Sequence, residues 1–229
     1  CQVTFIGPPP SSIRTMGDKA LARRVMREAG VPILPGTESG VSNSEEARET
    51  AASIGYPVLV KASFGGGGRG MRIVGAESEL EVALASAAAE AQAAFGDAEI
   101  YLERYLPSAR HVEVQIFADA HGNIVHLGER DCSVQRRHQK LVEEAPAPGL
   151  GENTRRELGE AAVQAAEAVD YRNAGTVEFL LDPDGKFFFS EMNARIQVEH
   201  PVSEMVTGLD LVREQIQVAA GKPLSFSQK

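Results

Sequence analysis

The chain has 229 residues, of which 43% are hydrophobic and 24% charged, with a formal net charge of -9. These values are ordinary for a globular protein with a real core, and the negative charge argues against general nucleic-acid binding. Two cysteines, Cys1 and Cys132, provide no disulfide framework and fit a reducing compartment. No apolar run reaches the roughly 18 residues needed to span a bilayer. Because the first residue is not Met, we expect a fragment, with residues 3–8 as the last strand of an upstream element.

The first half of the chain predicts helices alternating with short strands. Asp18 is the expected N-cap of a helix over 19–29, which Gly30 and Pro32 end. Ser42, with Glu45 three residues later, has the capping-box spacing and predicts a helix that ends at residue 55. The other elements expected here are a strand over 56–61, a strand over 71–74, a helix over 77–95 and a strand over 99–104.

The second half of the chain is richer in hairpins. The elements expected here are strands over 111–118 and 124–132, a basic loop over 133–148, a helix over 152–169, a hairpin from residue 178 and a helix over 209–220. Hairpins outnumber βαβ crossovers, so the pattern predicts an α+β fold rather than a doubly wound sheet.

The hairpin that begins at Glu178 carries the strongest chemical signal in the chain. Its turn, residues 182–185, reads Asp-Pro-Asp-Gly, and a simple register about it places Glu178 and Glu191 on one face of adjacent strands. Two carboxylates and an amide on one face suit Mg²⁺ shared with nucleotide phosphates. We favour this metal site over the alternative, an ordinary strand with one solvated face.

Polar residues continue at alternate positions beyond Glu191. The same parity is occupied by Glu191, Asn193, Arg195, Gln197 and Glu199. A fully extended chain would place the first and last of these roughly 26 Å apart. The segment must therefore bend if all five side chains serve one site.

The glycine-rich stretch from Gly65 to Gly70 lies between two predicted strands, and Lys61 precedes it. This order matches neither a Walker A loop nor a dinucleotide-binding fingerprint. A strand-loop-strand of this kind suits a flap whose backbone N–H groups cover phosphates. The alternative is a flexible linker, which the flanking Lys61 and Arg69 make the weaker interpretation.

A cluster of basic residues follows in the predicted loop region. Arg130, Arg136, Arg137 and Lys140 stand against only Asp131, which indicates an anion site in an acidic protein. By itself the cluster fits a solvated charged loop better than an anion site.

Several motifs together carry a resemblance to a known family. They are Phe5 to Pro8, Met16 to Lys19, Lys61 to Ser63 with Gly65 to Met71, Arg110 to Glu113, Glu129 to Pro148 and Glu191 to Pro201. The chain resembles, essentially end to end, the ATP-grasp portion of the biotin carboxylase family, and the last two motifs are highly specific. The resemblance implies an ATP-grasp fold with a small lid subdomain and a larger antiparallel-sheet subdomain, lacking the flanking N- and C-terminal domains. It also implies that residues 1–17 end a preceding domain, 18–229 form the ATP-grasp domain and 34–105 its inserted lid.

The resemblance implies an ATP-dependent ligase that carboxylates biotin on a carrier protein through carboxyphosphate, releasing ADP and phosphate. It implies ATP, Mg²⁺ or Mn²⁺ (two ions), bicarbonate and carrier-bound biotin as cofactors or substrates. The implied partners are a biotin carboxyl carrier protein and a carboxyltransferase of acetyl-CoA, propionyl-CoA or pyruvate carboxylases, with a homodimer for the full-length enzyme. The expected location is the cytoplasm or the mitochondrial matrix, with neither nucleic acid nor membrane as a partner.

Site residues follow from the resemblance position by position. The implied ATP-binding residues are Lys19, Lys61, Gly67, Gly68, Glu103, Arg104, Tyr105, Leu106, His111, Gln135 and His138. The implied metal ligands are Glu178, Glu191 and Asn193, and bicarbonate falls to Lys140, Arg195, Gln197 and the backbone of Val198. Glu199 is the implied general base, with Lys140 and Arg195 as the other catalytic residues.

Two alternatives to a biotin carboxylase stay open. One is another ATP-grasp ligase of the carbamoyl-phosphate synthetase type, against which the sequences 136–140 and 195–199 argue. The other is a non-catalytic nucleotide-binding fragment, because the Arg that the family uses for biotin would lie beyond Lys229.

Overall fold

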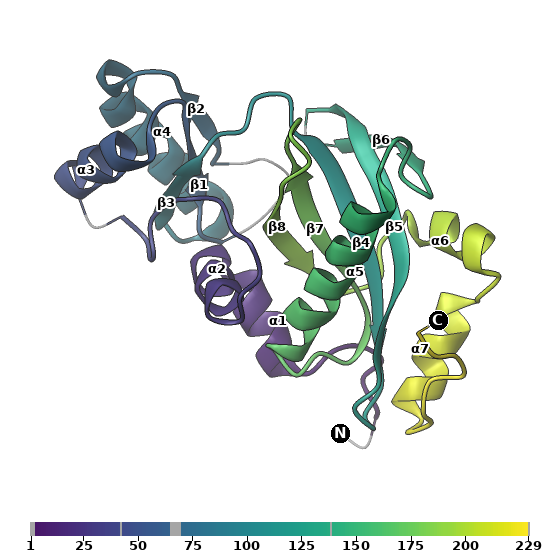
Figure 1. Ribbon diagram of the computed structural model, residues 1–229. Coiled ribbons are helices and arrows are strands. Elements are labelled where there is room, and N and C mark those ends of the chain that lie inside the picture. The colour runs from purple at the N-terminus through teal and green to yellow at the C-terminus, as the bar shows by residue number, and fades with distance from the viewer. Residues whose placement is uncertain (1–2, 42, 65–69, 138, 229) are drawn as a thin grey trace.

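The computed structural model describes residues 3–41, 43–64, 70–137 and 139–228 (Figure 1). Within these ranges the chain forms seven helices and two antiparallel sheets, one of three strands and one of five. The predicted α+β class is confirmed.

The five-stranded sheet has the strand order β6-β5-β4-β7-β8. Its strands are β4 (Arg110–Ala118), β5 (Ile124–Arg136), β6 (Gln139–Glu144), β7 (Asn173–Leu181) and β8 (Phe187–Asn193). Side chains alternate between the two faces along each strand, and helices cover both faces. Figure 1 shows α5 (Glu152–Glu167) crossing one face, while α6 (His200–Thr207) and α7 (Leu211–Ala219) lie on the other side.

Strand β4 shows how the two faces divide. Ile116 packs with Leu158 of α5 and Phe179 of β7 in the largest apolar cluster. Its neighbour Phe117 belongs to a separate cluster with Leu211 of α7. The N-terminal helices α1 (Pro10–Gly17) and α2 (Lys19–Glu28) join the first cluster through residues such as Met16 and Met26.

The three-stranded sheet forms a smaller unit with its own apolar core. It contains β1 (Val58–Ala62), β2 (Arg72–Val74), β3 (Ile100–Arg104), α3 (Ser44–Ile54) and α4 (Glu77–Phe95). The chain enters and leaves this unit side by side, because Arg104 N donates to Pro35 O at 2.8 Å and Thr37 N to Leu102 O at 2.8 Å. We call this part the three-stranded unit and the rest the five-stranded unit.

Local signals in the sequence located several element ends. Asp18 is the N-cap of α2 and accepts from Leu21 N at 3.0 Å, as predicted. The bounds of α4 match the predicted 77–95. The N-cap of α3 differs from the prediction: Asn43 accepts from the N–H groups of Glu45 and Glu46, and Ser42 lies outside the described residues.

Two other predictions about local structure are wrong. Residues 133–148 are not one loop, because β5 continues to Arg136 and pairs with β6. Residues 3–8 form no strand. The alternating run after Glu191 leaves the sheet at Asn193 and leads into α6, a helix that the sequence analysis did not predict. The predicted glycine flap, 65–69, lies outside the described residues.

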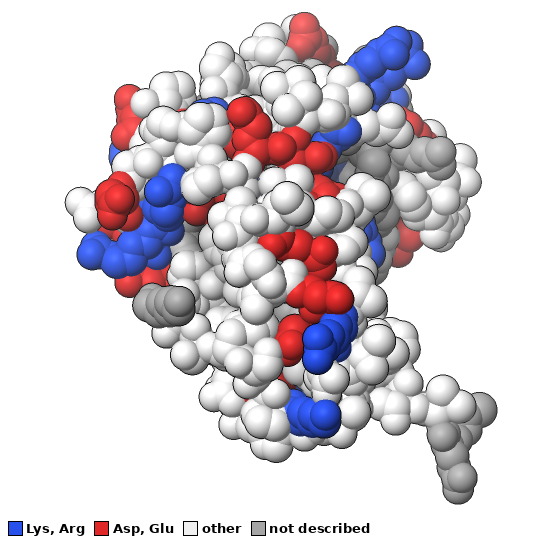
Figure 2. Space-filling model, turned by 90° about the vertical axis from the view of Figure 1, so that its right-hand side faces the viewer, with Lys and Arg blue, Asp and Glu red and all other residues white. Residues whose placement is uncertain are grey.

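The surface carries the acidic balance of the composition in a dispersed form. Figure 2 shows Asp and Glu spread over the face turned toward the viewer, with Lys and Arg in small separate groups. In the described parts of the chain, each helix is too short or too polar to cross a membrane.

Asp119 provides a test of how the C-terminal segment is held. Its carboxylate accepts from His121 N at 2.7 Å, Asn123 Nδ2 at 2.7 Å and Leu224 N at 2.9 Å. Burial alone would raise the pKa of Asp119, but these hydrogen bonds, that of the Asn123 side chain first, lower it below its usual value. The stabilisation is therefore present above the ordinary pKa of about 3.9 and is lost as the pH falls through the lower folded-state pKa.

We expect Asp119→Asn to reduce the free energy of unfolding at pH 7 by about 1–2 kcal/mol, since a charged acceptor becomes neutral. The gap between the variant and the parent should narrow near pH 3, where the parent carboxylate starts to take up its proton. Thermal unfolding at both pH values measures this, with Asp184→Asn in the exposed β7–β8 turn as the control. A gap that is equal at pH 7 and pH 3 would contradict the assignment.

Candidate functional site

A cleft of about 780 Å³ lies between the two units and is lined by residues of both. Nearly all of the site residues expected from the sequence line it. They are Lys19, Lys61, Glu103, Arg104, Tyr105, Leu106, His111, Gln135, Lys140, Glu178, Glu191, Asn193, Arg195, Gln197, Val198 and Glu199. The predicted residues Gly67, Gly68 and His138 lie outside the described part of the chain. The structure thus brings these side chains together, and their individual roles stay predictions.

A row of charged residues crosses the five-stranded sheet at the floor of the cleft. Glu191 of β8 pairs with Glu178 of β7, Glu178 with Glu113 of β4, and Glu113 with Arg130 of β5. Directly opposed residues in a sheet share one face, so three carboxylates and one guanidinium point the same way. The predicted register of Glu178 against Glu191 is confirmed, although a bulge follows at Phe179.

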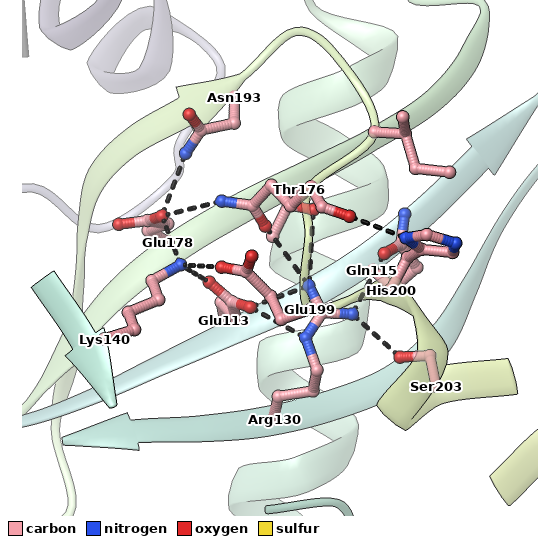
Figure 3. A network of polar contacts seen from close by, with 12 residues as sticks. Glu113, Gln115, Arg130, Lys140, Thr176, Glu178, Asn193, Glu199, His200 and Ser203 are labelled. Carbon is pink, nitrogen blue, oxygen red and sulfur yellow. Dashed lines mark hydrogen bonds and ion pairs between the residues drawn. The ribbon is translucent and has the colours of Figure 1, made fainter. Parts of the chain in front are cut away.

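Lys140 contacts two carboxylates of this row, those of Glu113 and Glu178, and also the carboxylate of Glu199. Its ammonium donates to Glu178 Oε1 at 2.9 Å, to Glu199 Oε1 at 2.6 Å and to Glu113 (Figure 3). Burial alone would lower the pKa of Lys140, but Glu178 and Glu113 raise it above its usual range. The ammonium therefore stays charged and offsets the repulsion between the three carboxylates.

Arg130 is the member of the row on β5 and is fully buried. It donates to Glu113 Oε1 at 2.7 Å, Gln115 Oε1 at 2.9 Å, Ser203 Oγ at 2.8 Å and Gln197 Oε1 at 3.2 Å. Figure 3 shows Glu113, Gln115 and Ser203 arranged around the guanidinium. The sequence interpretation that grouped Arg130 with an exposed basic loop is therefore wrong.

The segment after β8 bends, as a shared site required, and brings two predicted residues back to the row. Gln197 Nε2 donates to Glu178 Oε1 at 3.2 Å, and Glu199 meets Lys140. Arg195 stays exposed and donates to Asn193 Oδ1 at 3.1 Å. The Asn193 amide in turn donates to Glu178 Oε1 at 2.8 Å.

His111 connects the row to the wall of the cleft. Its Nε2 lies 2.6 Å from Glu178 Oε2, and its Nδ1 lies 2.8 Å from Gln135 Nε2. Burial would lower the pKa of His111, but the hydrogen bond to Glu178 raises it. Burial would likewise raise the pKa of Glu178, but His111 and Lys140 hold it well below its usual range. Glu178 is therefore kept ionised although it is almost completely buried.

The donor set suits a metal ion that is completed by a ligand. Among the described residues, no three His, Cys, Asp or Glu side chains are grouped as a ready-made metal site. Glu178, Glu191 and the Asn193 amide supply only part of an oxygen shell. Mg²⁺ commonly binds one or two carboxylates together with substrate phosphates, so these residues fit an ion shared with a nucleotide.

The layer that supports the site was missed in the sequence. Glu113 and Gln115 lie in the predicted strand 111–118, where both are completely buried. Both lie on the same face of β4 as Phe117, since they are at alternate positions. Polar residues on one face of a strand usually indicate that this face is solvated, so the pattern did not suggest that they are buried. A signal did exist, because Glu113 and Arg130, of opposite charge, occupy directly opposed positions on adjacent strands.

We expect Arg130→Met to reduce the free energy of unfolding by about 3–5 kcal/mol, because Glu113 would remain buried without its guanidinium partner. Adding Glu113→Gln to this variant should recover part of the loss. Urea unfolding measures both, with Arg136→Met at the exposed end of β5 as the control. A loss below about 1 kcal/mol, the size typical of an exposed ion pair, would show that the network contributes little.

The comparisons with known proteins agree with this geometry. The family described as carbamoyl-phosphate synthase L chain, ATP binding domain, matches residues 18–227. A biotin carboxylase of Nostoc sp. is 55% identical over 226 residues, which cover 99% of this chain and 51% of that protein. The biotin carboxylase of Haemophilus influenzae is 56% identical, with 99% and 50% covered. The chain thus spans about half the length of these curated relatives.

Solved structures give the same result. A biotin carboxylase from Campylobacter jejuni, described as a complex with β,γ-ATP, superposes with a TM-score of 0.96 at 52% identity. The match covers 98% of this chain and 50% of the Campylobacter jejuni chain. A second structure is the biotin carboxylase domain dimer of the Hydrogenobacter thermophilus 2-oxoglutarate carboxylase, described with MgADP, ADP and bicarbonate. It superposes with a TM-score of 0.96 at 51% identity, and the match covers 99% of this chain and 50% of the Hydrogenobacter thermophilus chain. The chain belongs to the carbamoyl-phosphate synthase L chain ATP-binding domain family, and its resemblance to the biotin carboxylases, with their ATP-grasp fold, is confirmed.

Proposed function

We propose that the chain is the ATP-grasp part of a biotin carboxylase, which carboxylates biotin on a carrier protein at the expense of ATP and bicarbonate. The observation that carries the proposal is the charged row. It places the paired carboxylates Glu178 and Glu191 in the same cleft as Lys140, Arg195 and Glu199. The identity of about 55% to biotin carboxylases supports it. We also propose residues 18–229 as the ATP-grasp domain, 34–105 as its lid and 1–17 as the end of a preceding domain.

The nucleotide would occupy the side of the cleft formed by the three-stranded unit. Lys61 of β1 places its ammonium group along this wall, which residues 103–106 also line. Lys19 of α2 adds a second ammonium group to the cleft, 3.5 Å from Glu191 Oε2. His111 and Gln135 approach from the five-stranded unit. Phosphoryl transfer depends on positioning and on neutralising phosphate charge, which two ammonium groups and a divalent ion supply.

Glu178, Glu191 and Asn193 would hold divalent metal ions. We propose that two ions bind and that they are Mg²⁺ or Mn²⁺. When bound, such an ion neutralises charge on the β- and γ-phosphates. The protein's own contribution is to keep Glu178 ionised, through His111 and Lys140, before any ion arrives. The Hydrogenobacter thermophilus structure described with MgADP supports the choice of Mg²⁺.

Bicarbonate would bind between Lys140, Arg195, Gln197 and the backbone of Val198. The Arg195 guanidinium is exposed to the cleft and is a planar fork that matches a carboxylate-shaped anion. Burial would raise the pKa of Glu199, but the hydrogen bond from Lys140 lowers it below its usual value. Glu199 is therefore an ionised carboxylate that can accept the bicarbonate proton. As the bicarbonate oxygen bonds to the γ-phosphorus, the bond to ADP breaks, and carboxyphosphate forms.

The remaining steps require groups outside this chain. The chain spans about half the length of its curated relatives, and we propose that the biotin-binding Arg expected from the family belongs to the part that it does not span. We propose a biotin carboxyl carrier protein and a carboxyltransferase as partners, supported by a relative that is one component of a pyruvate carboxylase. A homodimer is proposed for the longer enzyme. The 229-residue chain alone should then bind Mg-ATP and show at most a weak ATPase.

The second candidate is a carbamoyl-phosphate synthetase-type ligase, which the name of the matching family favours. Both reactions can begin with bicarbonate and ATP, so the acceptor distinguishes them. Radiolabelled bicarbonate transferred to biotin supports the first, and transfer that requires ammonia supports the second.

We expect the double variant Glu178→Gln, Glu191→Gln to lose the tightening of ATP binding by Mg²⁺, because neutral amides are poor ligands for a hard cation. Calorimetric titration of ATP with and without Mg²⁺ measures this in the 229-residue chain. A matched control is Asp182→Asn and Asp184→Asn in the turn of the same hairpin. If Mg²⁺ tightens ATP binding in the double variant as much as in the parent, the row is not the metal site.

We expect Glu199→Gln to lower bicarbonate-dependent ATP turnover by roughly 10²–10⁴-fold with little change in ATP affinity, because a base acts in the transition state. The assay uses a chimaera in which this chain replaces the matching half of the Haemophilus influenzae biotin carboxylase. Glu204→Gln in α6 is the control. Unchanged turnover in the Glu199 variant would remove that residue from the chemistry.

A further inference from the structure

Three buried charged side chains meet where α2 contacts the three-stranded unit. Glu103 of β3 accepts from Lys61 Nζ of β1 at 2.9 Å through Oε1, and from Arg23 Nη1 of α2 at 2.9 Å through Oε2. The exposed fractions of Arg23, Lys61 and Glu103 are only 3%, 6% and 2%. We call this group the hinge triad, since the chain enters and leaves the three-stranded unit beside it.

The hinge triad contains two cations and one anion. If Glu103 and Lys61 were alone, the carboxylate would cancel most of the field of the ammonium at a distance. Arg23 occupies the second carboxylate oxygen and leaves one positive charge in excess. Charges in a buried environment act over longer distances than exposed ones, because the effective dielectric constant is lower and salt screens them less.

Arg23 is also fixed on both sides of the junction. Its Nη2 donates to Leu34 O at 2.7 Å, where the chain enters the three-stranded unit. A Cβ added at Gly36 would come within 2.3 Å of Leu102 O and 2.8 Å of the same Nη2, so glycine there leaves room for both the strand β3 and the guanidinium. Both Arg23 and Lys61 lie 5.6 Å from the centroid of the Tyr101 ring, a cation–π distance.

We propose that Arg23 is a positioning residue for phosphate binding: it neutralises Glu103, so that Lys61 presents a net positive charge to the cleft. This rests on the proposed function, in which Lys61 contacts a nucleotide phosphate. Arg23 itself does not line the cleft, whereas Lys61 and Glu103 do. The affinity for anionic, phosphate-bearing ligands should therefore depend on Arg23, whereas the affinity for an uncharged nucleoside should not.

The test compares ATP with adenosine by calorimetric titration of the 229-residue chain. The variants are Arg23→Gln, Glu103→Gln and the double variant Arg23→Gln, Glu103→Gln. Arg24→Gln, at the exposed next position of α2, is the control for loss of a positive charge. Circular dichroism confirms that each variant is folded.

Charge balance predicts the order of ATP affinity. Arg23→Gln should weaken ATP binding roughly tenfold, since the triad loses its excess charge. Glu103→Gln should tighten ATP binding, because it raises the excess positive charge of the triad. The double variant should bind ATP about as tightly as the parent, because it restores the parent's excess charge. Adenosine affinity should change less than about twofold in Arg23→Gln, because Arg23 does not line the cleft.

A role that is only structural gives a different result. In that case Arg23→Gln weakens ATP and adenosine equally, and the double variant is no better than the worse single one; either outcome overturns the proposal. If Arg23→Gln does not fold, the other two variants still decide, and weaker ATP binding in Glu103→Gln overturns it. Lys61→Met separates the levels: if it leaves ATP affinity unchanged, the proposed nucleotide site itself fails.

Discussion

The arrangement of the cleft depends on a problem of charge repulsion. Glu113, Glu178 and Glu199 come from two strands and the start of a helix, and all three reach one ammonium group, that of Lys140. Carboxylates so close together repel one another unless a cation lies between them. Arg130, which also donates to Gln115, Ser203 and Gln197, fixes Glu113 from the other side. The rest of the site can then present ordered oxygens to a metal ion, because the repulsion is already offset.

The hinge triad applies the same principle on the opposite wall. There the imbalance is reversed, with two cations sharing Glu103. The floor of the cleft is thus rich in carboxylates and suits a divalent ion, while the nucleotide wall carries excess positive charge and suits phosphates. This separation of charge across one cleft favours a ligand in which phosphates and a metal ion come together.

Sequence patterns predicted what depends on neighbouring residues. The Asp-Pro-Asp-Gly turn fixed the pairing of Glu178 with Glu191, and Asp18 fixed the start of α2, because a turn and a cap act over a few residues. The end of β8 at Asn193 was not predictable in this way, since polar alternation continues to Glu199 whether or not the chain stays in the sheet. The end of β5, residues 133–136, and the strand β6 were mistaken for a loop, because their exposed residues resemble solvated chain.

The buried network under the site depends on contacts that are distant in sequence, and α6 shows why. One face of β4 runs from Phe117, packed against α7, through Gln115 to Glu113, which is buried beside Lys140. Its polar residues look solvated until α6 covers them. Ser203 of α6 lies 73 residues from Arg130 and accepts its hydrogen bond at 2.8 Å. The helix that no local pattern predicted therefore helps to exclude water from behind the site, and the charged row keeps its strength because of it.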